Sequence, residues 1–325
     1  MSQSVDQLGI DFTGFFAERG YRIDPPVPLL SDDPSLLFTN ASVTPYKQRM
    51  LEARAIAPSA VVQPCLRSNC SADRLSHFTM FGLIADYSFL TQLTADLQDF
   101  LTAQIRRPGR FVYRPCAGDD DLIEAWRATG RMLPDTIQPV PPRLNLTRWR
   151  YGMGESLLGK GGGIAVVAGD GGDGPDAHEW ILGTLIAIAS AAGRLYVEVA
   201  IGGECLAAAK ASADLFALPP ISDMVTLLME AGLGRNAARH QADAAMAVAA
   251  LVVEGCTPGP RGSHYLMRKY IHRIDPDSAA RLGDALLLPQ GVLRAIRAEH
   301  VRRAQSAGSR RGATAAPGRS GQEQS

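Results

Sequence analysis

Apolar and polar residues follow two different periods along this chain. Residues 4–19 carry their apolar side chains on one helical face and are followed by Gly20, a pattern that predicts an amphipathic helix with a defined end. Short runs rich in β-branched and aromatic residues, which are typical of strands, begin at Ser59 and recur up to residue 201. Leucines at 93, 97 and 101 interrupt this series and predict a helix over residues 90–105. This part of the chain therefore predicts a sheet with accompanying helices.

The pattern becomes purely helical from Leu215 onward. Residues 224–232, 237–254 and 263–274 each carry an apolar stripe, with glycine or proline between them. Residues 304–325 are mostly Ala, Ser, Gly and Arg without periodicity, which predicts a disordered tail. These changes predict a core over residues 1–212, a helical domain over residues 213–303 and a tail over residues 304–325.

The stretch from Ser59 to Phe89 joins two predicted strands around one conspicuous cation. Arg67 stands at the end of the first strand, and a polar loop over residues 68–76 leads into the second. A guanidinium group keeps its charge and offers paired donors, so it suits a carboxylate or phosphate ligand. The alternative is a structural ion pair with Asp73 or Asp86, and spacing alone does not separate the two.

Two other patterns imitate ligand sites. The run Asp119–Asp121 could suggest a metal, but acidic residues before a helix are more often explained by favourable interaction with its N-terminus. The glycine-rich residues 154–161 nearly match a phosphate-binding loop, which requires a following helix. The apolar run at residues 164–168 predicts a strand instead, so we reject this phosphate site.

Composition narrows the class of protein. The formal net charge is zero, so binding to nucleic acid would need a local basic patch. The five cysteines form no CxxC pair, which argues against a disulfide framework or a zinc site and favours a reducing compartment. We find no signal-peptide pattern and no apolar run long enough for a membrane span. The sequence thus predicts a cytoplasmic protein with no metal site and no membrane partner.

Three stretches, in order, resemble the motifs of the alanyl-tRNA synthetase catalytic core. The matching residues are 33–41 for motif 1, residues 64–67, 77–81 and 86–89 for motif 2, and residues 196–210 for motif 3. Residues 36–40 predict a buried strand, which the resemblance places along one wall of the amino acid pocket. Residues 149, 153–154 and 159–163 follow the family's order more loosely, and the resemblance extends over residues 4–275. It implies an α+β fold: a class II antiparallel sheet flanked by helices, followed by a small helical domain. That domain would be a partial tRNA-recognition domain, and the family's editing and C-terminal domains are not expected here.

The resemblance also implies roles for single residues. Arg67 would be the catalytic residue that bridges the α-phosphate of ATP and the amino acid carboxylate, and Glu198 would hold the substrate ammonium. The other implied substrate-binding residues are Asn40, Trp149 and Gly202. Phe81, together with Arg67, is the implied nucleotide contact.

Three departures from the family pattern concern nucleotide chemistry. Gly82 stands where the family has an acidic residue, Cys205 replaces the arginine that binds the γ-phosphate, and the strand near Leu182 lacks the family's asparagine. Removing one donor that stabilises transition-state charge typically costs about 3 kcal/mol. Arg67 and Glu198, which would bind the amino acid, are both retained. The pattern therefore favours amino acid recognition with weakened ATP chemistry.

Two functions remain open at this point. The favoured one is a synthetase-like protein repurposed to bind an amino acid, an aminoacyl-tRNA or a related small metabolite in a specialised pathway. The alternative is an active ATP-dependent ligase that activates an alanine-like amino acid and transfers it to tRNA or a small acceptor. ATP and Mg²⁺ are expected cofactors only in the second case.

The helix predicted over residues 263–274 is rich in cations. The resemblance implies that Arg268, Lys269 and Arg273 lie beside the acceptor stem of a tRNA. Arg268 and Lys269 each have a further basic residue one helical turn later, so two cationic stripes flank the apolar one. A solvated surface helix would show the same pattern, and the sequence does not decide between them.

Overall fold

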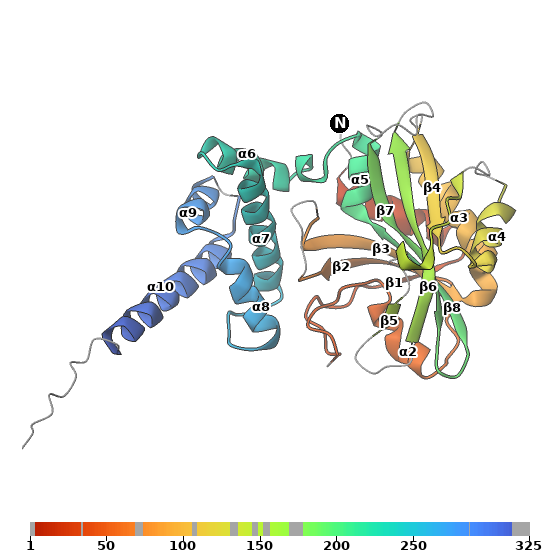
Figure 1. Cartoon of the computed structure of the whole chain (residues 1–325), viewed down its shortest axis with the longest axis horizontal. Helices are drawn as coiled ribbons and strands as arrows, with labels where there is room; N and C mark the ends of the chain where they lie inside the picture. Colours follow the sequence, from red (N-terminus) through yellow and green to blue (C-terminus); the bar gives the residue numbers. More distant parts are fainter. Residues whose placement is uncertain are drawn as a thin grey trace, which may run out of the picture. The chain divides into compact units, whose positions relative to one another are not determined.

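The chain forms two compact units in the computed structural model, residues Met1–Ser222 and Asp223–Ser325 (Figure 1). The structure describes residues 4–33, 35–68, 74–105, 109–130, 136–144, 149–151, 157–168, 178–285 and 287–313. Each unit has its own buried apolar core, so the two are described separately.

Unit 1 is built on an eight-stranded sheet. The strand order is β1-β2-β3-β8-β7-β6-β4, with β5 paired to β6. Neighbouring strands are antiparallel except for β1 and β2. The strands are β1 Arg22–Asp24, β2 Ser59–Leu66, β3 His77–Asp86, β4 Gly109–Pro115, β5 Trp149–Tyr151, β6 Leu157–Ala168, β7 Glu179–Ala189 and β8 Leu195–Gly202.

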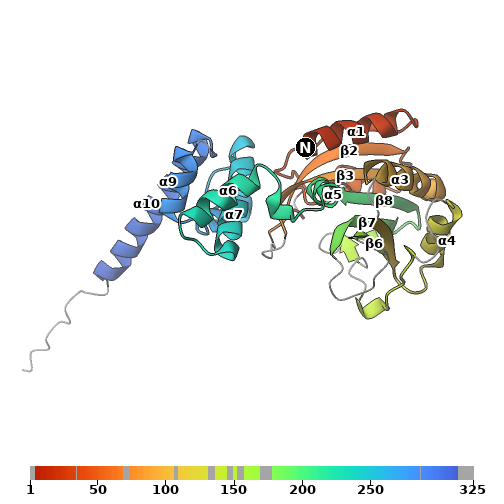
Figure 2. The ribbon, with the colours of Figure 1, turned by 90° about the horizontal axis from the view of Figure 1, so that it is seen from above.

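Helices cover one face of this sheet, which we call the helix face. These are α1 (Val5–Ala17), α3 (Leu90–Gln104) and α5 (Gly203–Ala211), and Figure 2 shows α1 and α3 lying along the strands. Their apolar stripes meet alternate residues of the central strands, such as Phe81, Leu83 and Val199, in one buried core. A further helix of this unit, α4, spans Asp120–Ala128 and packs its Trp126 against Tyr113 of β4.

The opposite face, which we call the open face, is covered by chain segments instead of long helices. Residues of the short helices η1 (Thr44–Tyr46) and α2 (Lys47–Leu51) pack on Val61, Ile84 and Ile186. Side chains alternate between the two faces along a strand, so residues two apart on β8 point to the same side. Glu198, Ala200 and Gly202 accordingly share the open face.

The predicted elements of unit 1 are confirmed with one exception. Residues 36–40 were expected to form a buried strand along the substrate site, but they contain no strand. Thr39 instead bonds through its N–H to the Leu29 carbonyl and through its hydroxyl to the Pro28 carbonyl. The Thr39 carbonyl accepts the Leu66 N–H at the end of β2, at 2.9 Å. The other Thr39 contacts go to a proline-rich segment, whose prolines have no N–H with which to continue a strand ladder.

Residues 157–161 of the glycine-rich run lie inside strand β6, so this part of the run does not form a loop. Gly161 and Gly162 sit where a Cβ would collide with the backbone of neighbouring strands, at the Leu185 carbonyl and at Pro115. Close strand packing therefore explains these glycines. Residues 154–156 of the run lie outside the described residues.

Unit 2 consists of helices. They are α6 Ile221–Glu230, which starts just before the boundary, α7 Arg235–Val253, α8 Gly262–Ile271, α9 Pro276–Asp284 and α10 Gln290–Ala313. Helix α10 includes residues 304–313, which were expected to belong to a disordered tail. A helix needs no apolar periodicity to extend by a few turns once its first part is anchored, here by Val292, Leu293 and Ile296. Residues 314–325 lie outside the described residues.

Candidate functional site

A buried carboxylate lies on the open face of the sheet. Glu198 is only 3% exposed, and its Oε1 accepts a hydrogen bond of 2.8 Å from the hydroxyl of Ser42. Burial raises the pKa of Glu198 to about 7, although the Ser42 hydrogen bond, the charge of Arg67 and the Val43 backbone N–H each lower it. Near neutral pH this group can therefore both bind a cation and hold a proton.

Gly82 lies directly beneath Ser42. It pairs with Ala200 across the sheet, so its open-face position is next to Glu198. A Cβ at Gly82 would lie 2.7 Å from Ser42 Oγ and closer still to Ser42 Cβ. Ser42 thus occupies the space that a side chain at position 82 would need.

Arg67 lies at the end of β2 on the same side. Its Nε donates a 3.0 Å hydrogen bond to the carbonyl of Asn40, and its guanidinium lies 5.1 Å from the centre of the Phe78 ring. The structural alternative for Arg67 was an ion pair with Asp86 or Asp73. Asp86 instead binds Arg194 at 2.7 Å, and Asp73 lies outside the described residues. Arg67 itself is exposed.

Small and apolar side chains connect these charged groups. Cys65, Met80 and Ala200 form one buried cluster that also contacts Ala41 and Phe78. The sulfur of Met80 accepts the backbone N–H of Ser42 at 3.1 Å. The segment 40–43 is therefore fastened to the sheet at Arg67, at Met80 and at Glu198.

The other expected substrate-binding residues, and the expected nucleotide contact Phe81, lie in different parts of unit 1. Asn40 joins the site through its carbonyl, and Gly202 ends β8 on the same face as Glu198. Trp149 starts strand β5, but its side chain lies outside the described part of the structure. Phe81 is fully buried on the helix face, where its ring stacks on Phe12 with centroids 5.2 Å apart. Because Phe81 points away from the open face, the implied nucleotide contact has no support here.

Glu204 and Cys205 lie at the start of α5, where the charges of Arg67 and Arg74 act on the Cys205 thiol. Both carboxylate oxygens of Glu204 accept the N–H of Thr79, at 2.9 and 3.0 Å, where β3 extends beyond its pairing with β8. Burial raises the pKa of Glu204 to about 7. Burial also raises the pKa of the Cys205 thiol to about 11, so it is uncharged at neutral pH. Cys205 therefore cannot replace an arginine in binding a phosphate.

The described residues contain neither a candidate metal-binding cluster nor a helix that could span a membrane. No group of three or more His, Cys, Asp or Glu side chains in that part of the chain is placed to hold a metal ion. None of its helices is long and apolar enough to cross a membrane. Asp121 of the acidic run binds Lys160 at 2.8 Å and also accepts a hydrogen bond from Tyr87.

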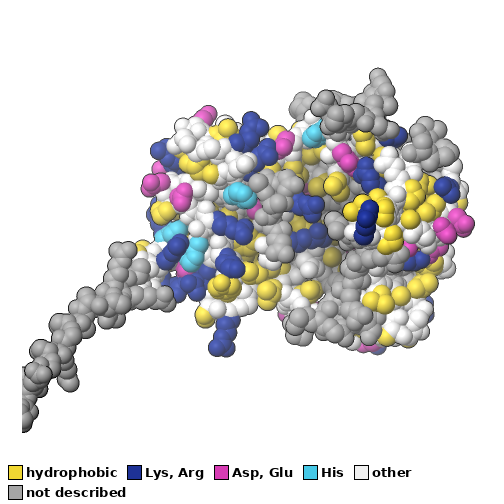
Figure 3. Space-filling model, viewed as in Figure 1, with side chains coloured by type: hydrophobic (Ala, Val, Ile, Leu, Met, Phe, Trp, Pro, Cys, Tyr) yellow, Lys and Arg dark blue, Asp and Glu magenta, His cyan; other side chains and the backbone are white. Residues whose placement is uncertain are grey.

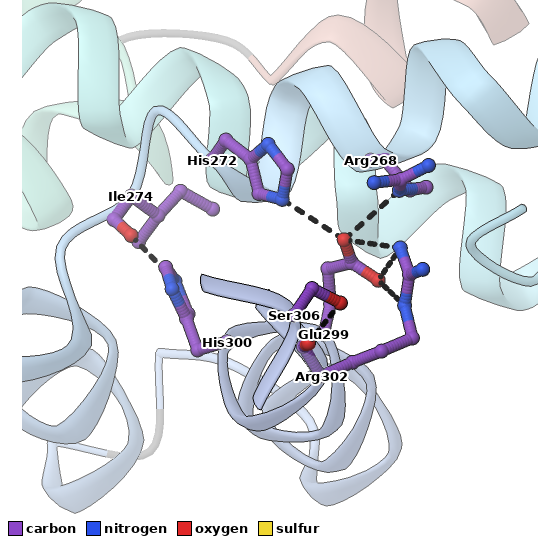
Figure 4. Close-up of polar contacts among 7 residues, drawn as sticks. All are labelled: Arg268, His272, Ile274, Glu299, His300, Arg302 and Ser306. Atoms are coloured by element: carbon purple, nitrogen blue, oxygen red, sulfur yellow. Dashed lines mark hydrogen bonds and ion pairs between the residues drawn. The ribbon is translucent and has the colours of Figure 1, made fainter. Parts of the chain in front are cut away.

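The basic helix of unit 2 is α8, and one of its cations is tied to α10 (Figure 4). Arg268 Nε donates to Glu299 Oε1 at 2.9 Å, and His272 Nε2 lies 2.9 Å from the same oxygen. Arg302 contacts Glu299 Oε2 at 2.6 Å. We call Glu299 and these three partners the Glu299 cluster. Its carboxylate is 2% exposed, and hydrogen bonds from the cations hold its pKa below the ordinary value against the effect of burial.

Lys269 and Arg273 are placed differently from Arg268. Both are exposed, and each lies over a tyrosine ring of α8, Lys269 at 5.1 Å from Tyr265 and Arg273, just after the helix, at 5.2 Å from Tyr270. Figure 3 shows Lys and Arg side chains spread over the visible face of unit 2. Of the three cations expected beside tRNA, these two are the ones directed to solvent.

Sequence reasoning missed Ser42 and Glu299. Ser42 is 156 residues from Glu198, and nothing in its local pattern distinguishes it from other serines. Glu299 sits within a run of basic residues on α10, and a lone acid in such a run is a signal that could have suggested a buried ion pair.

The antiparallel sheet, the helices on one face and the acidic residue on β8 define a class II aminoacyl-tRNA synthetase core. The family model described as tRNA synthetases class II (A) matches residues 8–172, which is 165 of the 325 residues. The chain belongs to this family.

Individual relatives are alanine–tRNA ligases and other synthetases. The chain is 26% identical over 306 residues to the alanine–tRNA ligase of Ehrlichia ruminantium, covering 83% of this chain and 34% of that protein. It is 24% identical over 326 residues to the ligase of Cutibacterium acnes, covering 82% and 36%. A solved histidyl-tRNA synthetase of S. aureus matches with a TM-score of 0.41 and 10% identity, covering 63% and 66%. The chain spans about a third of the length of the two ligases.

Proposed function

We propose that unit 1 binds an amino acid or the aminoacyl end of a related molecule between Arg67 and Glu198. The observation that carries this proposal is the placement of both groups on the open face, close enough for the charge of Arg67 to lower the pKa of Glu198. Arg67 offers donors to a carboxylate, and Glu198 offers acceptors to an ammonium. An ion pair formed at Glu198 would be shielded from water, which strengthens it.

Calorimetric titration with each of the twenty amino acids tests this proposal. We expect saturable binding of at least one of them, with an enthalpy that depends on the ionisation heat of the buffer because Glu198 releases a proton near pH 7. Arg67→Ala should weaken that binding by about tenfold or more, because it removes charge-assisted hydrogen bonds, worth about 1.5–3 kcal/mol, to the ligand carboxylate. Arg54→Ala, at an exposed surface pair with Glu52, is the matched control. Absence of binding by every amino acid would contradict the proposal.

The proposed function includes little or no formation of an aminoacyl adenylate. Gly82 has no acidic side chain, Cys205 is neutral, and Phe81 faces the helices. With these three contacts missing, we expect ATP–pyrophosphate exchange below a hundredth of the rate of an alanine–tRNA ligase assayed in parallel. Exchange at a comparable rate, abolished by Arg67→Ala, would instead establish the active ligase, with ATP and Mg²⁺ as its cofactors.

Unit 2 is proposed to contact the acceptor stem of a tRNA through α8. The two solvent-directed cations, Lys269 and Arg273, would each neutralise one phosphate, contributing together about −2 to the slope of log affinity against log salt. The double variant Lys269→Ala/Arg273→Ala should therefore flatten the slope by about that amount, measured by filter binding across a salt series. Arg235→Ala, an exposed cation at the start of α7, serves as control. If tRNA binding does not depend on Lys269 and Arg273, the acceptor-stem proposal fails and only the small-molecule function remains.

A further inference from the structure

Ser42 makes the closest described polar contact to the proposed ammonium-binding group. Its hydroxyl donates to Oε1 of Glu198 at 2.8 Å, and both residues are almost fully buried, at 2% and 3% exposure. The backbone N–H of Val43 donates to the same carboxylate. A carboxylate has about four acceptor positions, so these two donors leave capacity for an ammonium.

Ser42 can reach Glu198 only because position 82 is a glycine. Any side chain there would overlap Ser42, since a Cβ at Gly82 would lie 2.7 Å from Ser42 Oγ and 3.1 Å from Val61 Cγ1. Gly82 is buried between β2 and β8, paired with Val61 and Ala200, so the strand cannot shift to make room. Position 42 can therefore carry the serine side chain only because position 82 carries none.

We propose that Ser42 is a positioning residue, admitted by Gly82, that orients Glu198 so that its remaining acceptor positions face a ligand ammonium. The proposal rests on the proposed amino acid site. The hydroxyl supports the ionised carboxylate, because it donates a hydrogen bond and offers no charge that would compete with the ligand. Ser42 and Gly82 together therefore set both the direction and the ionisation of the ammonium-binding group.

Ser42→Ala separates this role from a purely structural one. The variant keeps the Cβ and loses the hydroxyl, so we expect the Glu198 titration midpoint, followed by carboxyl ¹³C NMR of the ligand-free protein, to rise by roughly one pH unit. Amino acid affinity should fall about fivefold at pH 7 and about tenfold below pH 6, with the pH profile displaced by the same one unit. Ser190→Ala is the matched control, because Ser190 is also buried and accepts the Arg194 N–H in a turn.

A double-mutant cycle tests the steric half of the proposal. Gly82→Ala alone should destabilise unit 1 and abolish binding, and Ser42→Gly/Gly82→Ala should regain stability because the overlap is removed. Ser42→Gly/Gly82→Ser returns a hydroxyl to the same space and should restore part of the lost affinity. Additive stability effects at positions 42 and 82 would overturn the steric arrangement.

The two proposals fail in different ways. If the wild-type protein binds no amino acid, the proposed function fails whatever Ser42 does. If it binds one but Ser42→Ala leaves both the NMR midpoint and the pH profile unchanged, the positioning role is overturned and the amino acid site stands.

Discussion

Replacing Glu198 with glutamine is expected to weaken amino acid binding about a hundredfold at pH 8 and to remove its dependence on pH. Glutamine keeps the shape and one acceptor oxygen, but it carries no charge to pair with an ammonium. Losing one partner of a shielded, hydrogen-bonded charge pair typically costs about 2–5 kcal/mol, or 30-fold and more in affinity. This is the largest effect that we expect from a single change in unit 1.

The sign of the pH dependence follows from the raised pKa. The free site titrates at about 7, and an ammonium binds only the ionised form. Wild-type affinity should therefore be constant above about pH 7 and fall about tenfold for each pH unit below it. The ligand's own carboxylate and ammonium keep their charges between pH 5 and 7, so this slope reports the protein. In Glu198→Gln the slope should vanish.

Glu204→Gln provides a matched control for this experiment. Glu204 has the same raised pKa of about 7, caused mainly by burial, yet it is engaged by the Thr79 N–H, which a glutamine oxygen can still accept. Calorimetry at several pH values should give wild-type affinity and slope for this variant. If Glu204→Gln and Glu198→Gln lose the pH slope equally, Glu198 is not the ammonium-binding group.

Replacing Glu299 with glutamine is expected to destabilise unit 2 by about 3 kcal/mol at pH 7. The change leaves Arg268 and Arg302 side by side without the anion that separates them. Breaking a fully buried pair costs roughly 3–5 kcal/mol, and we take the lower end because the two arginines are partly exposed. Hydrogen exchange of α8 and α10 is the appropriate measurement, since a chain of two units need not unfold in a single step.

This effect is lost on acidification, as is the affinity at Glu198, but at a lower pH, because the pKa of Glu299 is shifted in the opposite direction. The pKa of Glu299 is held below its ordinary value in the folded protein. Its contribution is therefore fully present above about pH 4.5 and is lost as the pH falls through the lowered pKa. Wild type and Glu299→Gln should become equally stable at acid pH, whereas Glu230→Gln, at an exposed position on α6, should match the wild type throughout. A difference that persists undiminished at acid pH would contradict an ionic origin.

The Glu299 cluster also affects the interpretation of tRNA-binding experiments on variants of the basic residues of α8. Arg268 contributes to the packing of α8 on α10, so Arg268→Ala would lower binding through instability even if Arg268 never touches a phosphate. In the described contacts Lys269 and Arg273 have no such packing role, because their side chains lie over Tyr265 and Tyr270. The double variant at these two positions is consequently the cleaner test of the acceptor-stem proposal.

Local patterns in the sequence were sufficient for most of the secondary structure and for the family. Strands β2, β3 and β8 and helices α1, α3 and α5 follow from alternation, helical spacing and glycine punctuation. Arg67 and Glu198 could be singled out from their places in the motif resemblance, although Glu198 lies in the middle of β8 and not near its end. The same reasoning failed at residues 36–40, where an apolar run is held by contacts to a proline-rich segment and not by a strand ladder.

Only the tertiary structure decided how the candidate groups are used. The Ser42–Glu198 hydrogen bond joins residues 156 positions apart, and the Arg268–Glu299 pair joins residues 31 apart. Neither leaves a local periodic signal, because the partners come from different elements. The raised pKa of Glu198, the burial of Phe81 on the helix face and the steric pairing of Gly82 with Ser42 likewise depend on which atoms surround each group. Sequence specifies the charges and their order along the chain, whereas their ionisation and direction depend on burial, which arises only when the sheet and its coverings are assembled.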